Sequence, residues 1–197
     1  LPSPGDIVLL KPGEPLESGL WAAEILENFG PGDALAAQEG IVKASHGIPT
    51  FFPDDVLAEA EVLPEVGDAE LADLDELLAS GERKDLRHIP FVTIDGESAR
   101  DFDDAVYVEE RPGSFTLWVG IADVSHYVRP ASALDGEALA RGNSYYFPQS
   151  VEPMLPEALS NDLCSLRPNT PRLAMAARMP FDGEGRPSGG AEFCAAV

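Results

Sequence analysis

The sequence predicts an α+β fold, in which a mixed sheet with flanking helices follows a small β-containing N-terminal module. Two hairpin signals predict the sheet, because strand-like apolar runs lie on both sides of turns rich in Pro and Gly. Apolar residues at helical spacing elsewhere in the chain predict the flanking helices. The 197 residues therefore combine sheet and helix in one chain.

The first part of the chain is predicted to begin with a short strand over residues 1–10. Residues 20–26 form either a second strand or a helical turn. Residues 33–45 have a helical pattern, with Asp33 as the N-cap and Gly47 as the C-terminal stop. We assign residues 1–45 to an N-terminal module, which is the remnant of an OB-like barrel, a winged-helix tail or a lineage-specific module.

A helical acidic linker is predicted over residues 46–84. Its first helix begins at Pro53 or Asp54, and residues 64–84 are acidic and rich in Leu and Ala at helical spacing. Such a charge run usually solvates a helix surface. The linker leads into the third part of the chain, residues 85–197.

This third part contains most of the predicted sheet. Strand-like residues 91–94 and 105–108 lie on either side of a polar turn. The other predicted elements are a hairpin of 105–108 with 115–122 around the turn 111–114, helices at 134–140 and 155–166, and a second hairpin of 172–180 with 191–197.

Four aspartates are crowded into the run TIDGESARDFDD, residues 93–104: Asp95, Asp101, Asp103 and Asp104. Like charges repel at short range, and burial raises the pKa of a carboxyl, so the cluster must be solvated or neutralised by cations. Mg²⁺ and similar hard cations take oxygen ligands and keep positions open for water and phosphate. The cluster therefore predicts a divalent metal site.

Two other interpretations compete with the metal site. An acidic run in an acidic protein is often only a solvated surface. An EF-hand calcium loop is excluded, because Ala105 stands where an oxygen ligand belongs and the turn glycine and closing glutamate are misplaced. The strand-like flanks favour the metal site, because a merely solvated loop needs no such anchors.

At these residues the chain resembles the ribonuclease II and ribonuclease R exoribonucleases, which share the RNB catalytic domain. A weaker resemblance covers residues 47–58. The main resemblance rests on DLRHIPFVTIDGESARDFDDAVYV (85–108), GIADVSHYV (120–128), RGNSYYFP (141–148), PMLPE (153–157) and LSNDLCSL (159–166).

The resemblance implies processive hydrolysis of single-stranded RNA from its 3′ end, with release of nucleoside 5′-monophosphates and a requirement for Mg²⁺ or Mn²⁺. The family's four acidic positions fall on Asp95, Asp101, Asp103 and Asp104 with unbroken spacing. Asp95 and Asp104 are then direct metal ligands, and Asp101 is a ligand directly or through water. Asp103 orients the metal-bound water or a second metal site.

In the family, an aromatic residue stacks on a base near the 3′ end of the RNA. The resemblance places this residue at Tyr146, and its neighbour Tyr145 is the weaker candidate. Stacking on an aromatic ring contributes about 1–3 kcal/mol per base and tolerates any sequence. The competing interpretation of Tyr146 is a ring packed at a strand end.

Composition does not point to nucleic acid, because the net charge is −22 while RNA-binding surfaces are usually basic. Residues 1–80 hold only two basic side chains against seventeen acidic ones, whereas residues 81–197 hold eleven against eighteen. Each arginine is by itself more often structural than a phosphate contact.

Cys164 and Cys194 are too few to staple the domain and fit a reducing compartment. We expect a cytoplasmic monomer that binds single-stranded RNA and no membrane.

The chain also departs from the family pattern. It stops partway through an RNB domain and lacks counterparts of the family's downstream glutamate and arginine and of its C-terminal OB-fold, as expected for a fragment. Two other functions stay open: a catalytically silent RNB relative that binds RNA, and a metal-dependent phosphohydrolase that acts on DNA or a nucleotide.

Overall fold

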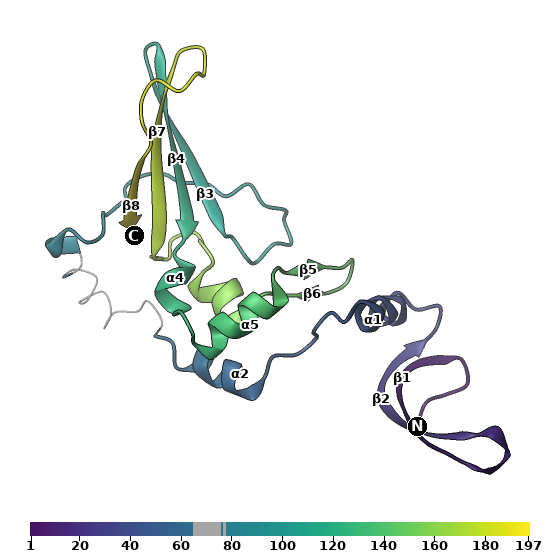
Figure 1. Cartoon of the computed structure of the whole chain (residues 1–197). Coiled ribbons are helices and arrows are strands. Elements are labelled where there is room, and N and C mark those ends of the chain that lie inside the picture. The colour runs from purple at the N-terminus through teal and green to yellow at the C-terminus, as the bar shows by residue number, and fades with distance from the viewer. Residues whose placement is uncertain (65–75, 77) are drawn as a thin grey trace. The chain divides into compact units, whose positions relative to one another are not determined.

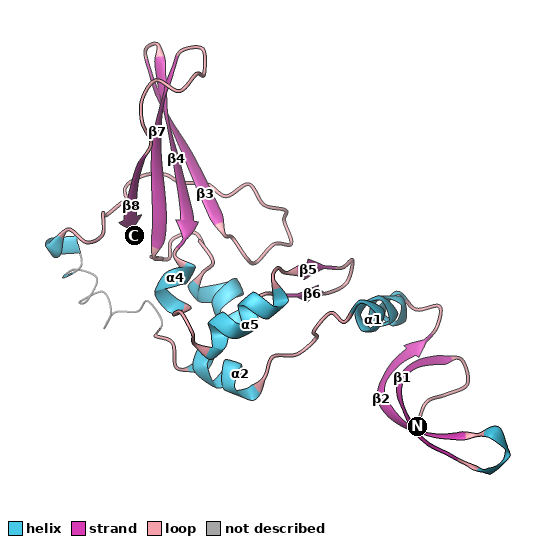
Figure 2. Cartoon of the chain, viewed as in Figure 1, coloured by secondary structure: helices cyan, strands magenta, loops and turns pink. Residues whose placement is uncertain are grey.

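A computed structural model describes residues 1–64, 76 and 78–197 of the chain (Figure 1). Helices occur together with antiparallel sheets, which confirms the predicted α+β class (Figure 2). No helix within the described residues is long and apolar enough to cross a membrane.

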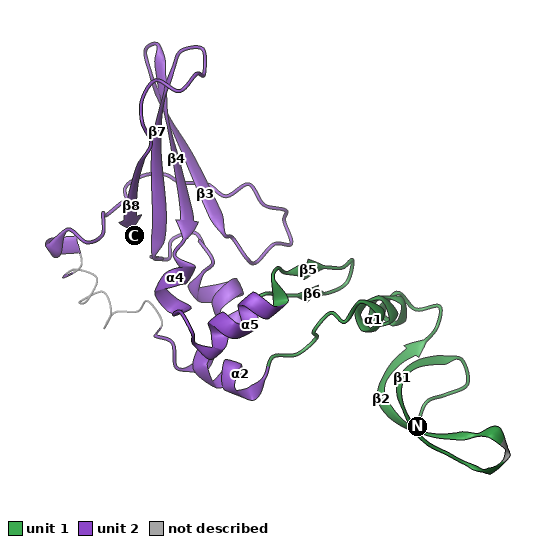
Figure 3. Cartoon of the chain, viewed as in Figure 1, with its two compact units in different colours: residues 1–52, 141–154 green, residues 53–140, 155–197 purple. Residues whose placement is uncertain are grey.

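The chain forms two compact units (Figure 3). Unit 1 consists of residues 1–52 and 141–154, and unit 2 consists of residues 53–140 and 155–197. Each unit is therefore built from two segments that are separate in sequence. This division differs from the sequence-based division into module, linker and RNB-like part, which stays a prediction.

Unit 1 begins with an antiparallel hairpin of two long strands, β1 (Asp6–Pro15) and β2 (Trp21–Pro31). A single 3-10 turn, η1 (Glu17–Gly19), joins them, and Gly19 has a positive φ of 73° that suits a residue without a Cβ atom. Of the two interpretations of residues 20–26, the strand is confirmed. The first strand lies further along the chain than the sequence predicts.

Helix α1 (Leu35–His46) follows the hairpin and ends as predicted at Gly47, which adopts a left-handed conformation with φ 63°. The predicted N-cap is wrong by one residue, because Ala34 occupies that position instead of Asp33. The backbone N–H of Ala34 donates to the carbonyl oxygen of Pro31 at 2.9 Å. This turn delays the start of the helix.

A small hairpin of β5 (Tyr145–Tyr146) and β6 (Val151–Glu152) completes unit 1. Lys43 of α1 forms an ion pair with Glu152, with 2.5 Å between Nζ and Oε1, and both side chains are only 13% exposed. The same Nζ donates to Oγ of Ser150 at 2.9 Å. The hairpin is thus fixed to α1 by a nearly buried polar contact.

Unit 2 is built around a four-stranded antiparallel sheet with the strand order β3-β4-β7-β8. The predicted hairpin turn is confirmed, because Arg111 pairs with Ser114 at the end of the first two strands. The second predicted hairpin is confirmed, because the last two strands of the sheet pair with each other. The strands are β3 (Asp104–Arg111), β4 (Ser114–Ala122), β7 (Ala174–Asp182) and β8 (Glu192–Ala196).

One face of this sheet carries small residues in register, since Gly120 of β4 pairs with Ala105 and Ala176 on its two neighbours. Leu86 packs into the core with Ala176, and Phe91 lies against the same cluster. A Cβ atom on Gly120 would lie 3.8 Å from the Phe91 ring. The small side chains therefore let the segment before the acidic run cover the sheet.

The predicted strand over residues 91–94 is wrong. Only Val92 pairs with the sheet, through a bridge in which it exchanges two backbone hydrogen bonds with Val106 at 2.9 and 2.8 Å. Phe91 instead turns toward the core, and its N–H bonds to the carbonyl of Ile89. A single bridge thus replaces a full strand before the acidic run.

Short helices complete unit 2. The helix predicted over residues 134–140 is confirmed, while the one predicted over 155–166 is shorter and contains a π-helical turn. The helix predicted over 64–84 lies mostly outside the described residues. The described elements are α2 (Asp54–Glu61), α4 (Val124–Tyr127), α5 (Ala133–Arg141) and η2 (Leu159–Leu163).

Candidate functional site

The acidic segment, residues 95–104, is anchored to the sheet of unit 2 at both ends. The Val92 bridge precedes it, and Asp104 is already the first residue of β3. The carbonyl oxygen of Asp103 accepts a hydrogen bond from the N–H of Ala122 at 2.9 Å. Residues 95–103 themselves form neither helix nor strand. The backbone of this segment is therefore positioned by its neighbours.

Three of the four aspartates, Asp95, Asp103 and Asp104, are exposed, and Asp101 is partly buried. Within the part of the chain that the structure describes, no Lys, Arg or His forms an ion pair with the three exposed ones. Their charge is thus balanced by solvent or by a bound cation.

The aspartates influence one another electrostatically. Desolvation by the surrounding protein raises the pKa of the Asp103 carboxyl, and the charges of Asp101, Asp104 and Asp95 raise it further, in that order. Asp103 reaches the surface, so its loss of hydration is partial. The proximity of four like charges costs stability unless a cation offsets their repulsion.

The donor chemistry of the segment fits a hard divalent ion, since carboxylate oxygens are the ligands that Mg²⁺ and Mn²⁺ prefer. Among the described residues, no three Asp, Glu, His or Cys side chains lie close enough together to hold a metal ion. The segment therefore fits a cation in charge and donor type, and its side chains do not form a closed ligand set. The predicted ligands Asp95, Asp101 and Asp104 stay a prediction.

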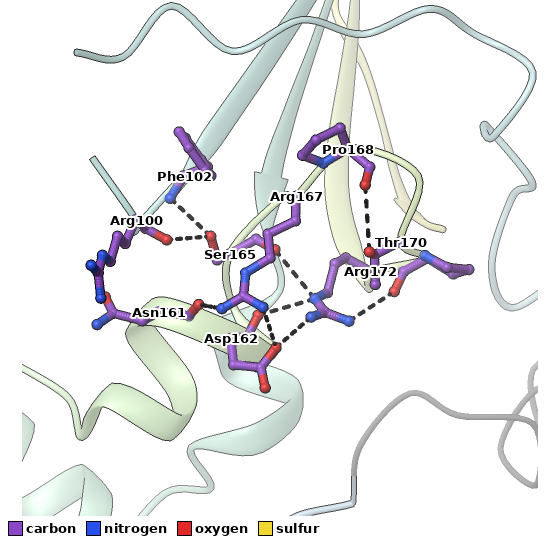
Figure 4. A network of polar contacts seen from close by, with 10 residues as sticks. Arg100, Phe102, Asn161, Asp162, Ser165, Arg167, Pro168, Thr170 and Arg172 are labelled. Atoms are coloured by element: carbon purple, nitrogen blue, oxygen red, sulfur yellow. Dashed lines mark hydrogen bonds and ion pairs between the residues drawn. The ribbon is translucent and has the colours of Figure 1, made fainter. Parts of the chain in front are cut away.

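A polar network lies beside the acidic segment, at the connection from η2 to β7 (Figure 4). The guanidinium of Arg172, which is 9% exposed, donates to the carbonyl oxygens of Asp162 and Ser165 at 3.0 and 3.2 Å. Arg172 also forms a 2.6 Å ion pair with the Asp162 carboxylate, which Arg167 approaches from outside at 3.4 Å. Arg172 is thus a structural arginine.

Ser165 connects this network to the acidic segment. Its side chain is fully buried, and its Oγ donates to the carbonyl of Arg100 at 2.6 Å and accepts the N–H of Phe102 at 3.2 Å (Figure 4). Sequence reasoning missed this residue. Two signals pointed to it, a lone hydroxyl in the run Leu163 to Leu166 and the resemblance of that run to the family.

The predicted RNA contact, Tyr146, lies on β5 in unit 1 and is 65% exposed. Its neighbour Tyr145 is partly buried. A base can stack only on a ring whose face is accessible, and this exposure argues against a ring packed at the strand end. The RNA contact itself stays a prediction.

The family described as RNB domain matches residues 83–197, which are more than half of the chain. The chain belongs to the RNB family. Its match includes the acidic segment, the Arg172 network and Tyr146. Ribonuclease R of Acidithiobacillus ferrooxidans is 45% identical over 189 residues, which are 95% of this chain. The resemblance found in the sequence is thereby confirmed.

Solved structures agree with this membership. Mycoplasma genitalium RNase R in complex with double-stranded RNA superposes on 98% of this RNB chain with a TM-score of 0.80 and 31% identity. Yeast Ssd1, a pseudonuclease, shares the fold at a TM-score of 0.61 and 14% identity. The fold therefore occurs both in RNase R and in a pseudonuclease.

The RNB chain spans only part of these relatives. It covers 41% of the length of the Acidithiobacillus protein and 33% of the Mycoplasma chain. The activity, substrate and partners of a whole ribonuclease R are therefore matters for proposal in this chain.

Proposed function

We propose that this chain carries the acidic part of the catalytic site of a processive 3′-to-5′ exoribonuclease. The substrate is single-stranded RNA, and the products are nucleoside 5′-monophosphates. One observation carries the proposal: an RNB chain keeps four crowded aspartates on a segment held by the sheet, with no cation of the described residues paired to the three exposed ones. Such an arrangement costs stability, and metal-dependent hydrolysis accounts for its retention.

Each aspartate has a proposed role. Asp95 and Asp104 would bind the ion directly, Asp101 would bind it directly or through water, and Asp103 would orient the metal-bound water or a second metal site. The ion, Mg²⁺ with Mn²⁺ as a substitute, supplies an activated water and neutralises charge on the phosphoryl group and the leaving 3′ oxygen. The raised pKa of Asp103 reflects desolvation first and then the repulsion of the other three aspartates, and a bound cation would offset this repulsion.

Tyr146 is proposed to stack on a base near the 3′ end, a contact that its exposed ring supports. Stacking of this kind contributes about 1–3 kcal/mol per base without selecting a sequence. We also propose a cytoplasmic protein, a proposal supported by two cysteines that are both free thiols. We further propose that the protein is a monomer.

The test uses the full-length protein with 5′-labelled single-stranded RNA, incubated with Mg²⁺ or with EDTA and followed on a denaturing gel. We expect metal-dependent shortening from the 3′ end, with 5′-monophosphates as products. Asp103→Asn should abolish cleavage and leave RNA binding intact, because it removes one charge with almost no change in shape. The matched control is Glu110→Gln, which removes an exposed charge from β3.

A second candidate is the catalytically silent RNA-binding protein, since the fold occurs both in RNase R and in a pseudonuclease and does not distinguish the two functions. The same assay separates the two functions. Intact RNA with and without Mg²⁺, bound equally by wild type and Asp103→Asn, would establish the silent protein. Loss of both cleavage and RNA binding in Asp103→Asn would contradict the role assigned to this residue.

A further inference from the structure

The backbone of the acidic segment is held from outside at several points, and two adjacent residues supply three of the contacts. The buried Oγ of Ser165 uses both its donor and its acceptor capacity on the carbonyl of Arg100 and the N–H of Phe102. The N–H of Leu166 donates to the carbonyl of Phe102 at 2.8 Å. Both peptide groups that flank Asp101 are therefore fixed.

These contacts reach across the chain, because Ser165 is 65 residues from Arg100 and 63 residues from Phe102. They also substitute for secondary structure, since residues 95–103 form neither helix nor strand. On the other side, Ala122 of β4 holds the carbonyl of Asp103. Residues 165–166 and strand β4 thus hold the backbone around Asp101 and Asp103.

Ser165 itself is oriented by Arg172. The guanidinium binds the carbonyl oxygens of Asp162 and Ser165 and the Asp162 carboxylate, so it closes the turn that delivers the hydroxyl (Figure 4). A planar fork with several donors can make these bonds together, whereas a lysine ammonium cannot reproduce the geometry. The network therefore runs from Arg172 through Ser165 to the backbone around Asp101.

We propose that Ser165 is a positioning residue, whose buried hydroxyl holds the backbone on both sides of Asp101 so that the aspartates can bind a divalent cation together. This inference rests on the proposed function. Ser165 touches neither the ion nor RNA, and it acts through the peptide groups of the acidic segment. Groups that orient metal ligands from behind in this way change metal affinity when they are removed.

The test measures Mn²⁺ affinity by calorimetry and amide hydrogen exchange in the metal-free, full-length protein. Ser165→Ala should lower Mn²⁺ affinity by about 10-fold to 100-fold, the usual effect of removing a group that orients a ligand. It should also speed exchange of the Phe102 amide, while the Val106 amide of the sheet stays protected. Cleavage should show a lower kcat with an unchanged KM for RNA.

Two further variants support the interpretation. Ser160→Ala is the matched control, because among the described residues the hydroxyl of Ser160 in η2 bonds to the carbonyls of Leu155 and Pro156, at 3.4 Å, and not to the acidic segment. It should change neither Mn²⁺ affinity nor Phe102 exchange. Ser165→Cys replaces the hydroxyl with a somewhat larger thiol that is a weaker donor, and it should give an intermediate affinity.

Unchanged Mn²⁺ affinity in Ser165→Ala would overturn the proposal, even if Phe102 exchange became faster, because the hydroxyl would then be only structural. Asp104→Asn in the same titration separates this failure from failure of the proposed function. If Asp104→Asn lowers affinity and Ser165→Ala does not, only the positioning role is wrong. If neither lowers it, the metal site itself is wrong.

Discussion

The carboxylates that hold α1 to its hairpin in unit 1 differ from those of the acidic segment in unit 2. In unit 1, Glu152 pairs with Lys43 at 2.5 Å, and the buried Glu39 accepts hydrogen bonds from Oγ of Ser150 at 2.7 Å and from the N–H of Gln149 at 2.9 Å. In unit 2, the acidic segment places four carboxylates within range of one another, and the three exposed ones have no cation of the described residues as a partner.

The difference shows what each set of charges does. In unit 1, ion pairing and hydrogen bonds offset the free-energy cost of desolvating the carboxylates, and these contacts hold α1 to its hairpin. Crowded carboxylates reduce stability by repelling one another, so their presence in one short segment requires another reason. A function that uses a bound cation supplies that reason. Carboxylates with a structural role in unit 1 thus differ from the carboxylates of unit 2 for which we propose a catalytic role.

The largest expected effect concerns catalysis. Asp104→Asn in the full-length protein should lower kcat/KM for single-stranded RNA by about 1000-fold, because metal stabilisation of the transition state amounts to several kcal/mol. Stability should not fall, since the substitution relieves repulsion on Asp103. Kinetics on labelled RNA and urea unfolding measure the two effects. Near-normal cleavage would remove Asp104 from the catalytic site.

The next effect concerns the ion pair of unit 1. Lys43→Met should lower the free energy of unfolding by about 3 kcal/mol, because it leaves the carboxylate of Glu152 nearly buried without its partner. Urea unfolding followed by circular dichroism measures it.

Lys11→Met is the control for this prediction. Its ion pair with Glu24 spans 4.0 Å between side chains that are 69% and 68% exposed. This substitution should change stability by less than about 1 kcal/mol, since exposed pairs contribute little. Equal effects of the two substitutions would show that burial does not decide what a charge contributes here.

A smaller effect depends on pH and tests a paired carboxylate within unit 2. Burial acts to raise the pKa of Asp123, but hydrogen bonds from Arg83 at 2.6 Å and Ser125 at 2.7 Å and the Arg83 charge outweigh it, and the pKa is lowered. Asp123→Asn should lower the free energy of unfolding by about 2 kcal/mol at pH 7, which is typical of the loss of a hydrogen bond to a charged group.

The sign of this pH dependence follows from the lowered pKa. Because the folded state holds the Asp123 proton less tightly, the stabilisation is complete above the unfolded pKa of about 3.9 and is lost as pH falls through the lower folded value. Unfolding curves of wild type and Asp123→Asn should therefore converge on acidification below pH ~4. A difference that stays constant with pH would show that the charge of Asp123 is not responsible.

The smallest effect concerns Cys164, which reports on the surroundings of Asp103. Burial first, then the charges of Asp103 and Asp123, raise the pKa of its thiol to about 12. Cys164 is 2% exposed, so a thiol reagent at pH 8 should modify only Cys194 in the folded protein. Mass spectrometry of the peptides distinguishes the two sites. Rapid modification of Cys164 would contradict the buried surroundings described for it.

The sequence predicts those parts of the fold that depend on local pattern. Both hairpins of the main sheet and helix α1 are confirmed, because alternation of apolar residues and turn chemistry are local signals. The strand at residues 91–94 is wrong for a tertiary reason. Phe91 turns into the core against the small residues of the sheet, which leaves a single bridge at Val92.

The aspartates of the candidate site are equally visible in the sequence, since all four lie within ten residues, 95–104. Ser165, whose hydroxyl holds the backbone of the acidic segment, is not visible in the sequence in this way. Ser165 contacts the segment across more than sixty residues of sequence, and no periodicity reveals a hydrogen bond over that separation. The division into two units is also a tertiary property, because residues 141–154 leave their sequence neighbours to join unit 1.

The free energy of unfolding of wild type and Asp103→Asn, measured without and with Mg²⁺ in the full-length protein, tests whether the acidic segment is a cation site. Without the ion, Asp103→Asn should be at least as stable as wild type, because one of four repelling charges is gone. With Mg²⁺, wild type should gain stability and the variant should gain less. A variant that is less stable without the ion, and that Mg²⁺ stabilises as much as wild type, would show that the acidic segment is not a cation site.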